Sequence, residues 1–131
     1  MFRFIAIAAA TVFAFPVLAD GHAVDLTATG DVAAGEKAFR KCVSCHVVVN
    51  GDGETLAGKR AKTGPNLYGV VGATSGSVEG FKYSKLMLAA GEGGTIYDEE
   101  NFVAYVQDPT GFLRGVTGES GRGKMTYKVR K

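Results

Sequence analysis

The chain has no tryptophan, only two cysteines and three prolines, and its charges nearly balance, with 15 Lys and Arg against 13 Asp and Glu in 131 residues. Two cysteines cannot form the dense disulfide framework that stabilises many small secreted domains. A formal net charge of +2 is too small for nucleic-acid binding, which needs a concentrated basic face. The length indicates one domain and excludes a multi-domain enzyme.

Hydrophobic residues make up 46% of the chain, which excludes wholesale disorder. Glycine is abundant, with 19 residues, and this favours turns and loops over long regular elements. No alternation typical of strands persists for more than a few residues, so the chain reads as a small all-α protein with long loops. Because a domain of this size buries only about two-thirds of its chain surface, such loops predict a bound group that fills the middle of the fold.

The one long hydrophobic run lies at the N-terminus. Arg3 precedes an apolar run that extends to Phe15, and small residues follow before Asp20. This pattern predicts a signal peptide over residues 1–19, which is cleaved to leave a single domain over residues 20–131. The alternative is a membrane anchor, but a bilayer helix needs about 20 apolar residues and this run is too short. We therefore expect an exported protein without stable membrane insertion.

Three helices are indicated by their caps and apolar faces. Asp31 is a good N-cap for a helix that leads to the two cysteines. Ser84 caps a short helix that runs to Ala90 and stops at a glycine. Asp98 caps the clearest helix, which has two glutamates in its first turn and ends at Pro109.

The segments between these helices carry no regular pattern. Residues 20–30 form a loose arm, and His22 within it has no second ligand nearby and receives no role. Residues 50–64 are rich in glycine and basic side chains and predict a surface loop. Residues 110–123 are glycine-rich as well, and we expect them to be irregular.

Both cysteines fall in one short motif, Cys42-Val43-Ser44-Cys45-His46. Cys-x-x-Cys-His is the attachment signature of c-type haem. Two thiols on one helical turn can each add to a haem vinyl group, and the adjacent histidine offers a ring nitrogen to the iron. The motif therefore predicts one covalent haem c, held by Cys42 and Cys45, with His46 as an iron ligand.

Three other interpretations of this motif compete with haem. A thiol–disulfide exchange site expects a βαβ context, and no strand is predicted before Cys42. A zinc site needs four ligands, whereas the motif supplies three and leaves only His22 as a fourth. A plain disulfide, as in an assembly module, has no need of His46. The export signal favours haem because it delivers the chain to the compartment where haem is attached.

The sixth position on the iron separates electron carriers from oxygen or peroxide chemistry. Met87, Met125, His22 and several lysines are the candidates. Met87 lies in an apolar run and reads as a core methionine on a helix. Met125 lies in a polar, irregular stretch with no apolar stripe to join, so we expect it to bind the iron. An open position would instead indicate an enzyme such as a haem peroxidase, or a binder of NO or CO.

The chain resembles class I c-type cytochromes, and most closely the bacterial cytochrome c2 type, from residue 30 to about residue 128. The resemblance implies the class I cytochrome c fold, with short helices and long loops wrapped around one covalent haem. The motifs that agree in order and spacing are Gly-Glu-Lys-Ala-Phe-Arg-Lys-Cys at 35–42, Lys-Thr-Gly-Pro-Asn-Leu-Tyr-Gly at 62–69, Phe-Lys-Tyr at 81–83, Tyr-Asp-Glu-Glu at 97–100, Ala-Tyr-Val-Gln-Asp-Pro at 104–109 and Lys-Met-Thr-Tyr at 124–127.

The resemblance also implies roles for residues outside the haem motif. His46 and Met125 would be the two axial ligands, and the carbonyl of Pro65 would accept a hydrogen bond from His46. Tyr83 matches a donor to a haem propionate, and Tyr105 matches a residue whose hydroxyl approaches the ligand sulfur. The residue beside the exposed haem edge would be Tyr127.

Two positions depart from the pattern of the family. Ala73 stands where many relatives have an arginine near a propionate, and Tyr97 stands where many have tryptophan. Both changes alter the expected surroundings of the propionates, which in turn affect the reduction potential.

The function that the resemblance implies is one-electron transport in the periplasm, without enzymatic activity. The electron would come from a membrane quinol:cytochrome c oxidoreductase and pass to a photosynthetic reaction centre, an oxidase or a reductase. We expect a monomer that docks on acidic surfaces through lysines around the haem edge, and charge reversal at two of them, Lys124 and Lys128, to slow association. The lysines in question are Lys37, Lys41, Lys59, Lys62, Lys82, Lys85, Lys124 and Lys128.

Relatives continue past the position of Lys131 into a C-terminal helix. That helix packs on the first helix, near the positions of Gly35 and Phe39. We therefore expect the domain over residues 20–131 to lack this helix and the natural gene to encode further residues in an amphipathic helical pattern. Sequencing past Lys131 tests this expectation.

Overall fold

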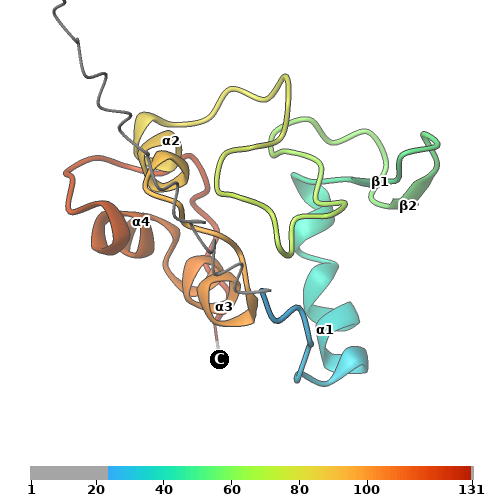
Figure 1. Cartoon of the computed structure of the whole chain (residues 1–131). Coiled ribbons are helices and arrows are strands. Elements are labelled where there is room, and N and C mark those ends of the chain that lie inside the picture. Colours follow the sequence, from blue (N-terminus) through green and yellow to red (C-terminus); the bar gives the residue numbers. More distant parts are fainter. Residues whose placement is uncertain (1–23, 131) are drawn as a thin grey trace, which may run out of the picture.

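The computed structural model describes residues 24–130, and the predicted signal peptide and His22 lie outside these residues (Figure 1). The described chain is mainly helical, as expected, with one small hairpin. No helix in the described range is long and apolar enough to cross a membrane. In chain order the elements are α1 (Val32–Phe39), the 3-10 turn η1 (Cys42–Ser44), β1 (Val48–Val49), β2 (Thr55–Ala57), α2 (Lys85–Glu92), α3 (Glu99–Gln107) and α4 (Pro109–Thr117).

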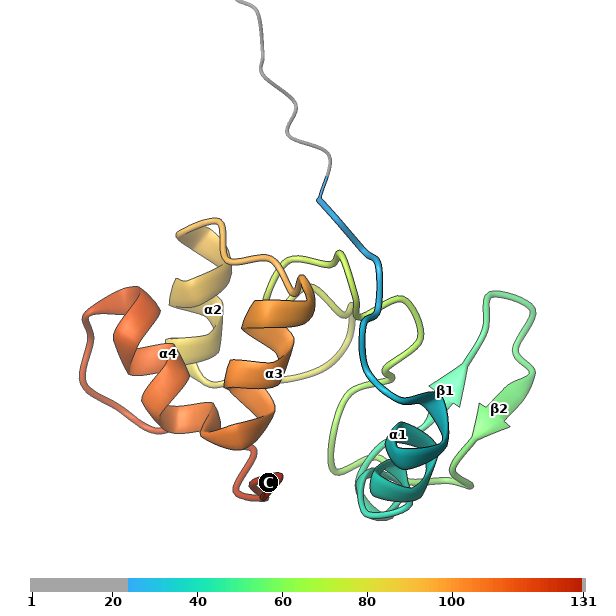
Figure 2. The same cartoon turned by 90° about the horizontal axis from the view of Figure 1, so that it is seen from below.

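The elements form two groups, one on each side of the molecule (Figure 2). In one group α4 packs against both α2 and α3. In the other, α1 leads into η1 and lies on the same side as the hairpin. A long loop, residues 58–84, connects the two groups. The haem motif lies in the group of α1 and the hairpin, whereas Met125 follows α4 in the chain.

The N-terminal arm was predicted to be loose, and its described part is in fact anchored. Its described residues, 24–30, form no helix or strand. The backbone N–H and the hydroxyl of Thr29 both donate to the carboxylate of Glu99, at 2.8 and 2.9 Å. The Thr29 backbone bond and then its hydroxyl bond lower the pKa of Glu99. The arm is thereby tied to the first turn of α3.

Helix α1 begins as the sequence predicts. The Asp31 carboxylate accepts a hydrogen bond from the Ala34 N–H at 2.6 Å, which satisfies one of the free donors of the first turn. The helix ends at Phe39 and has no buried residue. A Cβ at Gly35 would meet nothing within 4 Å, so in the described chain no backbone comes close to it.

The hairpin is a correction to the predicted surface loop. Val48 pairs with Ala57 and Val49 with Thr55 in antiparallel register, with an irregularity between the two pairs. The Asn50 side chain organises the turn, because its oxygen accepts from the Glu54 N–H at 2.8 Å. The strands were missed because two and three residues are too few to show an alternation.

Helix α2 starts at its predicted cap but extends two residues further than predicted. The Ser84 hydroxyl accepts from the Met87 N–H at 3.2 Å. The helix continues past Ala90 to Glu92, so Gly91 does not stop it. A Cβ at Gly91 would lie 2.2 Å from the Ser75 carbonyl oxygen, so this glycine permits close packing of the loop on the helix.

Helix α3 has its predicted cap and end, whereas α4 is a second correction. The Asp108 carboxylate accepts from the Gly111 N–H at 3.2 Å and Pro109 is the first helical residue. Pro109 was read as a stop, yet proline also fits the first position of a helix, where its missing N–H costs nothing. The region expected to be irregular is therefore helical up to Thr117, and Gly118 with φ 68° ends it.

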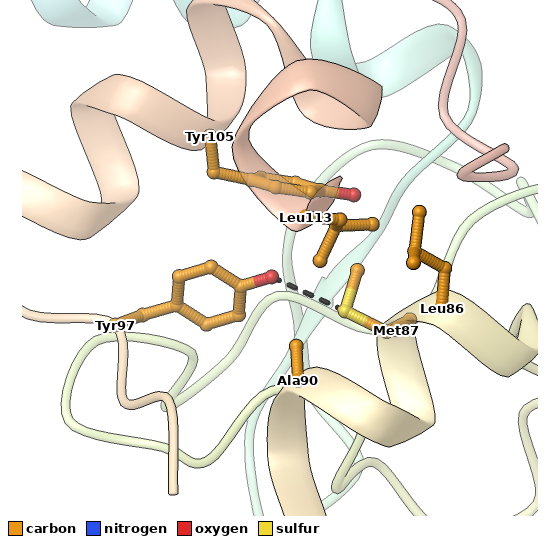
Figure 3. Close-up of a cluster of buried hydrophobic side chains, with 6 residues drawn as sticks. All are labelled: Leu86, Met87, Ala90, Tyr97, Tyr105 and Leu113. Carbon is orange, nitrogen blue, oxygen red and sulfur yellow. Dashed lines mark hydrogen bonds between the residues drawn. The ribbon is translucent and has the colours of Figure 1, made fainter. Parts of the chain in front are cut away.

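The core lies where α2, α3 and α4 meet (Figure 3). Its aromatic side chains contact one another. The ring centroids of Tyr97 and Tyr105 are 5.3 Å apart, and those of Tyr105 and Phe112 are 6.0 Å apart. Leu113 from α4 is completely buried between them and α2. The buried hydrophobic residues are Leu86, Met87, Ala90, Tyr97, Tyr105 and Leu113.

We predict that Leu113→Ala lowers the free energy of unfolding by about 2–5 kcal/mol, because it leaves a cavity among the three helices. Val116→Ala is the matched control, since Val116 lies on the same helix and is 45% exposed. We expect the control to cost less than about 0.5 kcal/mol. Guanidinium unfolding of the haem-loaded protein measures both, and equal losses in the two variants would contradict this account of the core.

Candidate haem site

The imidazole of His46 is fixed by a backbone hydrogen bond. Its Nδ1 donates to the carbonyl oxygen of Pro65 at 2.8 Å, the contact that the sequence resemblance implied. A proton on Nδ1 leaves Nε2 with a free lone pair, which is the state that binds a metal. The Gly64 N–H donates to the Cys45 carbonyl at 2.8 Å and holds the two segments together.

Gly64 lies directly against the same imidazole ring. A Cβ at this position would be 2.2 Å from Cε1 of His46 and 2.5 Å from Nδ1, far closer than carbon atoms approach. The orientation of the imidazole ring is therefore fixed by its hydrogen bond to Pro65 and by its close contact with the backbone of Gly64. Sequence reasoning did not assign Gly64 a role, although its place just before Pro65 was a signal.

Cys42 begins the short η1 turn and Cys45 is its C-cap, and both carry free, half-buried thiols. The N–H groups of Cys45 and His46 both donate to the Cys42 carbonyl, at 3.0 and 2.9 Å, so the motif is one tight turn. Burial raises the pKa of the Cys42 thiol, and the charge of Cys45 adds to the effect. Within residues 24–130, no three His, Cys, Asp or Glu side chains are grouped as metal ligands.

The two methionines named as candidates have different surroundings. Met87 is buried, and its sulfur accepts a hydrogen bond from the Tyr97 hydroxyl at 3.3 Å (Figure 3), which agrees with its prediction as a core residue. Met125 is half-buried at the edge of the same core, in a segment without helix or strand. No hydrogen bond to its sulfur occurs in the described part of the chain.

The tyrosines of the core keep their hydroxyl protons. Burial is the main cause that raises the pKa of Tyr105 far above its usual value, with Tyr97 and Tyr83 as weaker causes. Burial likewise raises the pKa of Tyr97 and of Tyr83. Protonated hydroxyls can act as hydrogen-bond donors to a sulfur or to an anionic group.

Comparisons with known proteins agree on one family. The chain is 62% identical over 104 residues to the cytochrome c2 of Rhodovulum adriaticum, which covers 79% of this chain and 82% of the relative. It is 41% identical over 128 residues to the cytochrome c2 of Rhodobacter capsulatus, covering 97% and 88%. The crystal structure of cytochrome c2 from Rhodobacter sphaeroides superposes with a TM-score of 0.76, at 56% identity, covering 78% of this chain and 85% of that one. No family model matches the chain.

The chain belongs to the cytochrome c2 family. It is therefore a small electron carrier with the class I cytochrome c fold and one covalently attached c-type haem, and it is not an enzyme. The two thiols at Cys42 and Cys45 fit the attachment motif of the family.

The donor groups of the site suit a haem. The hydrogen bond of His46 leaves its Nε2 free, and the thiols of Cys42 and Cys45 are free within the described residues. A covalently attached, histidine-ligated haem needs these three groups. Ser75, which nothing in the sequence pattern singled out, is 3% exposed and lies elsewhere, next to Tyr97 and Gly91.

The lysines predicted to surround the haem edge fall into two classes. Lys128 forms an ion pair with Asp108 at 2.7 Å, and its hydrogen bond is the main cause that lowers the pKa of that carboxyl. The Lys124 ammonium donates to the Lys82 carbonyl and lies over the ring of Phe81. The other lysines are exposed and make no ion pair or side-chain hydrogen bond within the described chain; they are Lys37, Lys41, Lys59, Lys62, Lys82 and Lys85.

We predict that Gly64→Ala displaces the His46 ring and disturbs the iron. The added methyl group overlaps the imidazole, and overpacking of this kind costs about 1–3 kcal/mol. We expect a changed visible spectrum, a shifted reduction potential and a lower stability, measured on the haem-loaded protein.

Gly115→Ala is the matched control for this substitution, because a Cβ there meets open space on α4. The control should leave the iron spectrum unchanged and stabilise the helix by about 0.5–1 kcal/mol. A Gly64→Ala protein with an unaltered spectrum and potential would show that the ring can move aside at no cost.

Proposed function

We propose that Cys42 and Cys45 form the two thioether links to the haem, and that His46 and Met125 are the axial ligands of its iron. The observation that carries this proposal is the contrast between the two sulfurs. The sulfur of Met87 accepts a hydrogen bond inside the core, whereas that of Met125 is free at the edge of the core. The hydrogen bond from His46 to Pro65 supports the other half of the ligand pair.

When bound, the haem supplies a one-electron couple between ferric and ferrous iron, and ligation by histidine and methionine raises its potential. The role of the protein is to keep water away from the haem and to fix the orientation of the groups that bind it. The carbonyl of Pro65 orients the imidazole of His46 and makes it a better donor. In this proposal Tyr105, whose pKa is raised by burial, donates its hydroxyl proton toward the sulfur of Met125, and Tyr83 donates toward a propionate.

The partners are proposed from the same family relationship. The carrier works in the periplasm as a monomer, accepts an electron from a quinol:cytochrome c oxidoreductase, and delivers it to a reaction centre, an oxidase or a reductase. Tyr127 is 45% exposed, and in this proposal it is the residue beside the haem edge, where partners approach. Exposed lysines steer the encounter with acidic partner surfaces.

The first test replaces each of the two methionines with alanine in a separate variant. Met125→Ala should open the iron, lower the reduction potential and let cyanide or CO bind quickly. Met87→Ala should leave the visible spectrum of the iron unchanged and lower stability by about 2–5 kcal/mol, because Met87 is a core residue. Oxidised and reduced spectra of both variants measure the ligation. The reverse pattern would assign the iron to Met87.

The second test concerns steering by charge. Lys128 and Lys124 already make an ion pair and a hydrogen bond within the chain. Exposed lysines close in sequence to the haem motif and to Gly64 are therefore the better targets. Lys41 directly precedes Cys42, and Lys62 lies two residues before Gly64. Replacing Lys41 and Lys62 with Glu should lower the rate of association with an acidic redox partner by about an order of magnitude at low salt. The difference should fade as salt rises, since exposed charges are screened beyond about 8 Å at physiological ionic strength.

Lys85→Glu tests whether position matters among the lysines expected around the haem edge, because Lys85 is an exposed residue of α2 in the other group of elements. It should lower the association rate less than either of the two substitutions near His46. Equal effects of all three, or rates that ignore salt, would assign these lysines to solubility alone. Stopped-flow kinetics at several salt concentrations measures the rates.

A further inference from the structure

The turn of the hairpin contains an Asn-Gly step, Asn50-Gly51, which the electron-transfer function does not use. In such a step the side-chain amide precedes a backbone nitrogen whose own residue has no side chain. Attack of that nitrogen on the amide carbon closes a succinimide ring and releases ammonia. Glycine favours this attack, because without a Cβ its backbone is permissive and its nitrogen accessible. The reaction needs no enzyme, and water reopens the ring.

The backbone N–H of Gly51 is available for this attack. Gly51 is exposed, and its N–H makes no hydrogen bond within the described residues. The same turn contains a second step of this kind, Asp52-Gly53. There, however, the N–H of Gly53 donates to the backbone carbonyl of Asn50 at 3.1 Å. The structure therefore separates two steps that look alike in the sequence and leaves Asn50 as the reactive one.

The side chain of Asn50 is held by three hydrogen bonds. Its Oδ1 accepts from the N–H of Asp52 at 3.1 Å and from the N–H of Glu54 at 2.8 Å. Its Nδ2 donates to the carboxylate of Glu54 at 3.2 Å. Glu54 thus contacts both ends of the amide. Hydrogen bonds to an ionised group are stronger than those between neutral groups, so the carboxylate is a good restraint on this side chain.

We propose that Asn50 is a self-modification site, and that its bond to the carboxylate of Glu54 restrains the reaction. When the side chain rotates out of its bonds, the nitrogen of Gly51 attacks the amide carbon. A C–N bond forms, and the side-chain nitrogen leaves as ammonia together with the proton of the Gly51 N–H. Water then adds to one carbonyl of the ring and gives aspartate or isoaspartate. No electron moves, and the chain gains one negative charge.

The product cannot rebuild the turn. A carboxylate at position 50 has no donor for Glu54, so a hydrogen bond is replaced by repulsion between two negative charges. The change stops at the end of β1, because the side chain of Asn66 binds the backbone of Val49 twice, at 2.9 and 2.8 Å. The modified protein should therefore keep the visible spectrum of the haem. The inference is independent of which residues bind the iron.

The experiment follows the haem-loaded protein at one mildly alkaline pH. Peptides taken at intervals are analysed by mass spectrometry for the conversion of amide to acid. Asn66 and Asn101 are internal controls, because leucine and phenylalanine follow them. Conversion at Asn50 should be about tenfold faster than at either control, since only its neighbour lacks a side chain. Equal rates at the three asparagines would overturn the proposal.

A second arm repeats the measurement in guanidinium, where the turn is open. Conversion at Asn50 should then be several-fold faster than in the folded protein, and isoaspartate should also form at Asp52, whose following N–H is no longer bonded. A rate at Asn50 that is the same in both states shows that the turn exerts no restraint. An unfolded chain in which Asn50 stays unchanged shows that it is not a modification site.

Variants of Glu54 test the restraint in the folded protein. Glu54→Ala should speed conversion by about three- to tenfold, because one charge-assisted hydrogen bond to the amide is lost. Glu54→Gln keeps an oxygen that can accept from Nδ2, and its rate should return toward that of the parent. Glu79→Ala is the matched control, since Glu79 is an exposed loop carboxylate without a bond to an asparagine. A parent rate in Glu54→Ala, or the same acceleration in Glu79→Ala, overturns the role of Glu54.

Gly51→Ala tests the nucleophile itself. A Cβ at Gly51 meets nothing within 4 Å, so the variant should fold like the parent. The added methyl group hinders the attack and restricts the backbone, and conversion at Asn50 should slow by about tenfold. Gly115→Ala, whose Cβ also meets open space, should leave the rate unchanged. A Gly51→Ala protein that converts as fast as the parent would show that the Gly51 nitrogen is not the attacking group.

Discussion

The hydrogen bond from His46 to the Pro65 carbonyl is the contact on which the rest of the site depends. It sets the tautomer of the imidazole and therefore which ring nitrogen can bind iron. Gly64 makes the bond possible, because any side chain at that position would occupy the space of the ring. The two residues Gly64 and Pro65 thus fix the orientation of the imidazole of His46, the proposed ligand.

The two groups of secondary structure contribute different parts of the site. The thiols and His46 come from the turn that follows α1, whereas Met125 and the tyrosines 83, 97 and 105 lie in or against the core at α2, α3 and α4. The main hydrophobic core lies in the group of α2, α3 and α4, whereas α1 has no buried residue. A haem held by the proposed residues would therefore be a structural element as well as a redox group, because it would join the two groups of secondary structure.

Much of the fold followed from local signals, and the exceptions share a cause. Asp31, Ser84 and Asp98 are caps in the sequence and in the structure, because capping depends only on the next few residues. The end of α2 and the existence of α4 were predicted wrongly. In both cases a glycine or a proline was read as a stop. The role of Gly91 depends on close packing against the distant Ser75, whereas Pro109 starts α4 next to its cap Asp108, a local signal that also fits the end of a helix.

The sequence by itself determined the chemistry: a Cys-x-x-Cys-His motif predicts one haem because its spacing places three reactive groups on one turn, whatever surrounds it. It also separated a core methionine, Met87, from one at the edge. Only the tertiary structure decided how the remaining polar groups are used. The bond from Tyr97 to the sulfur of Met87, the unpaired hydroxyl of Ser75 and the commitment of Lys124 to a distant carbonyl join residues far apart in the chain. Such pairings depend on which loops the packed core brings together, and no local pattern encodes them.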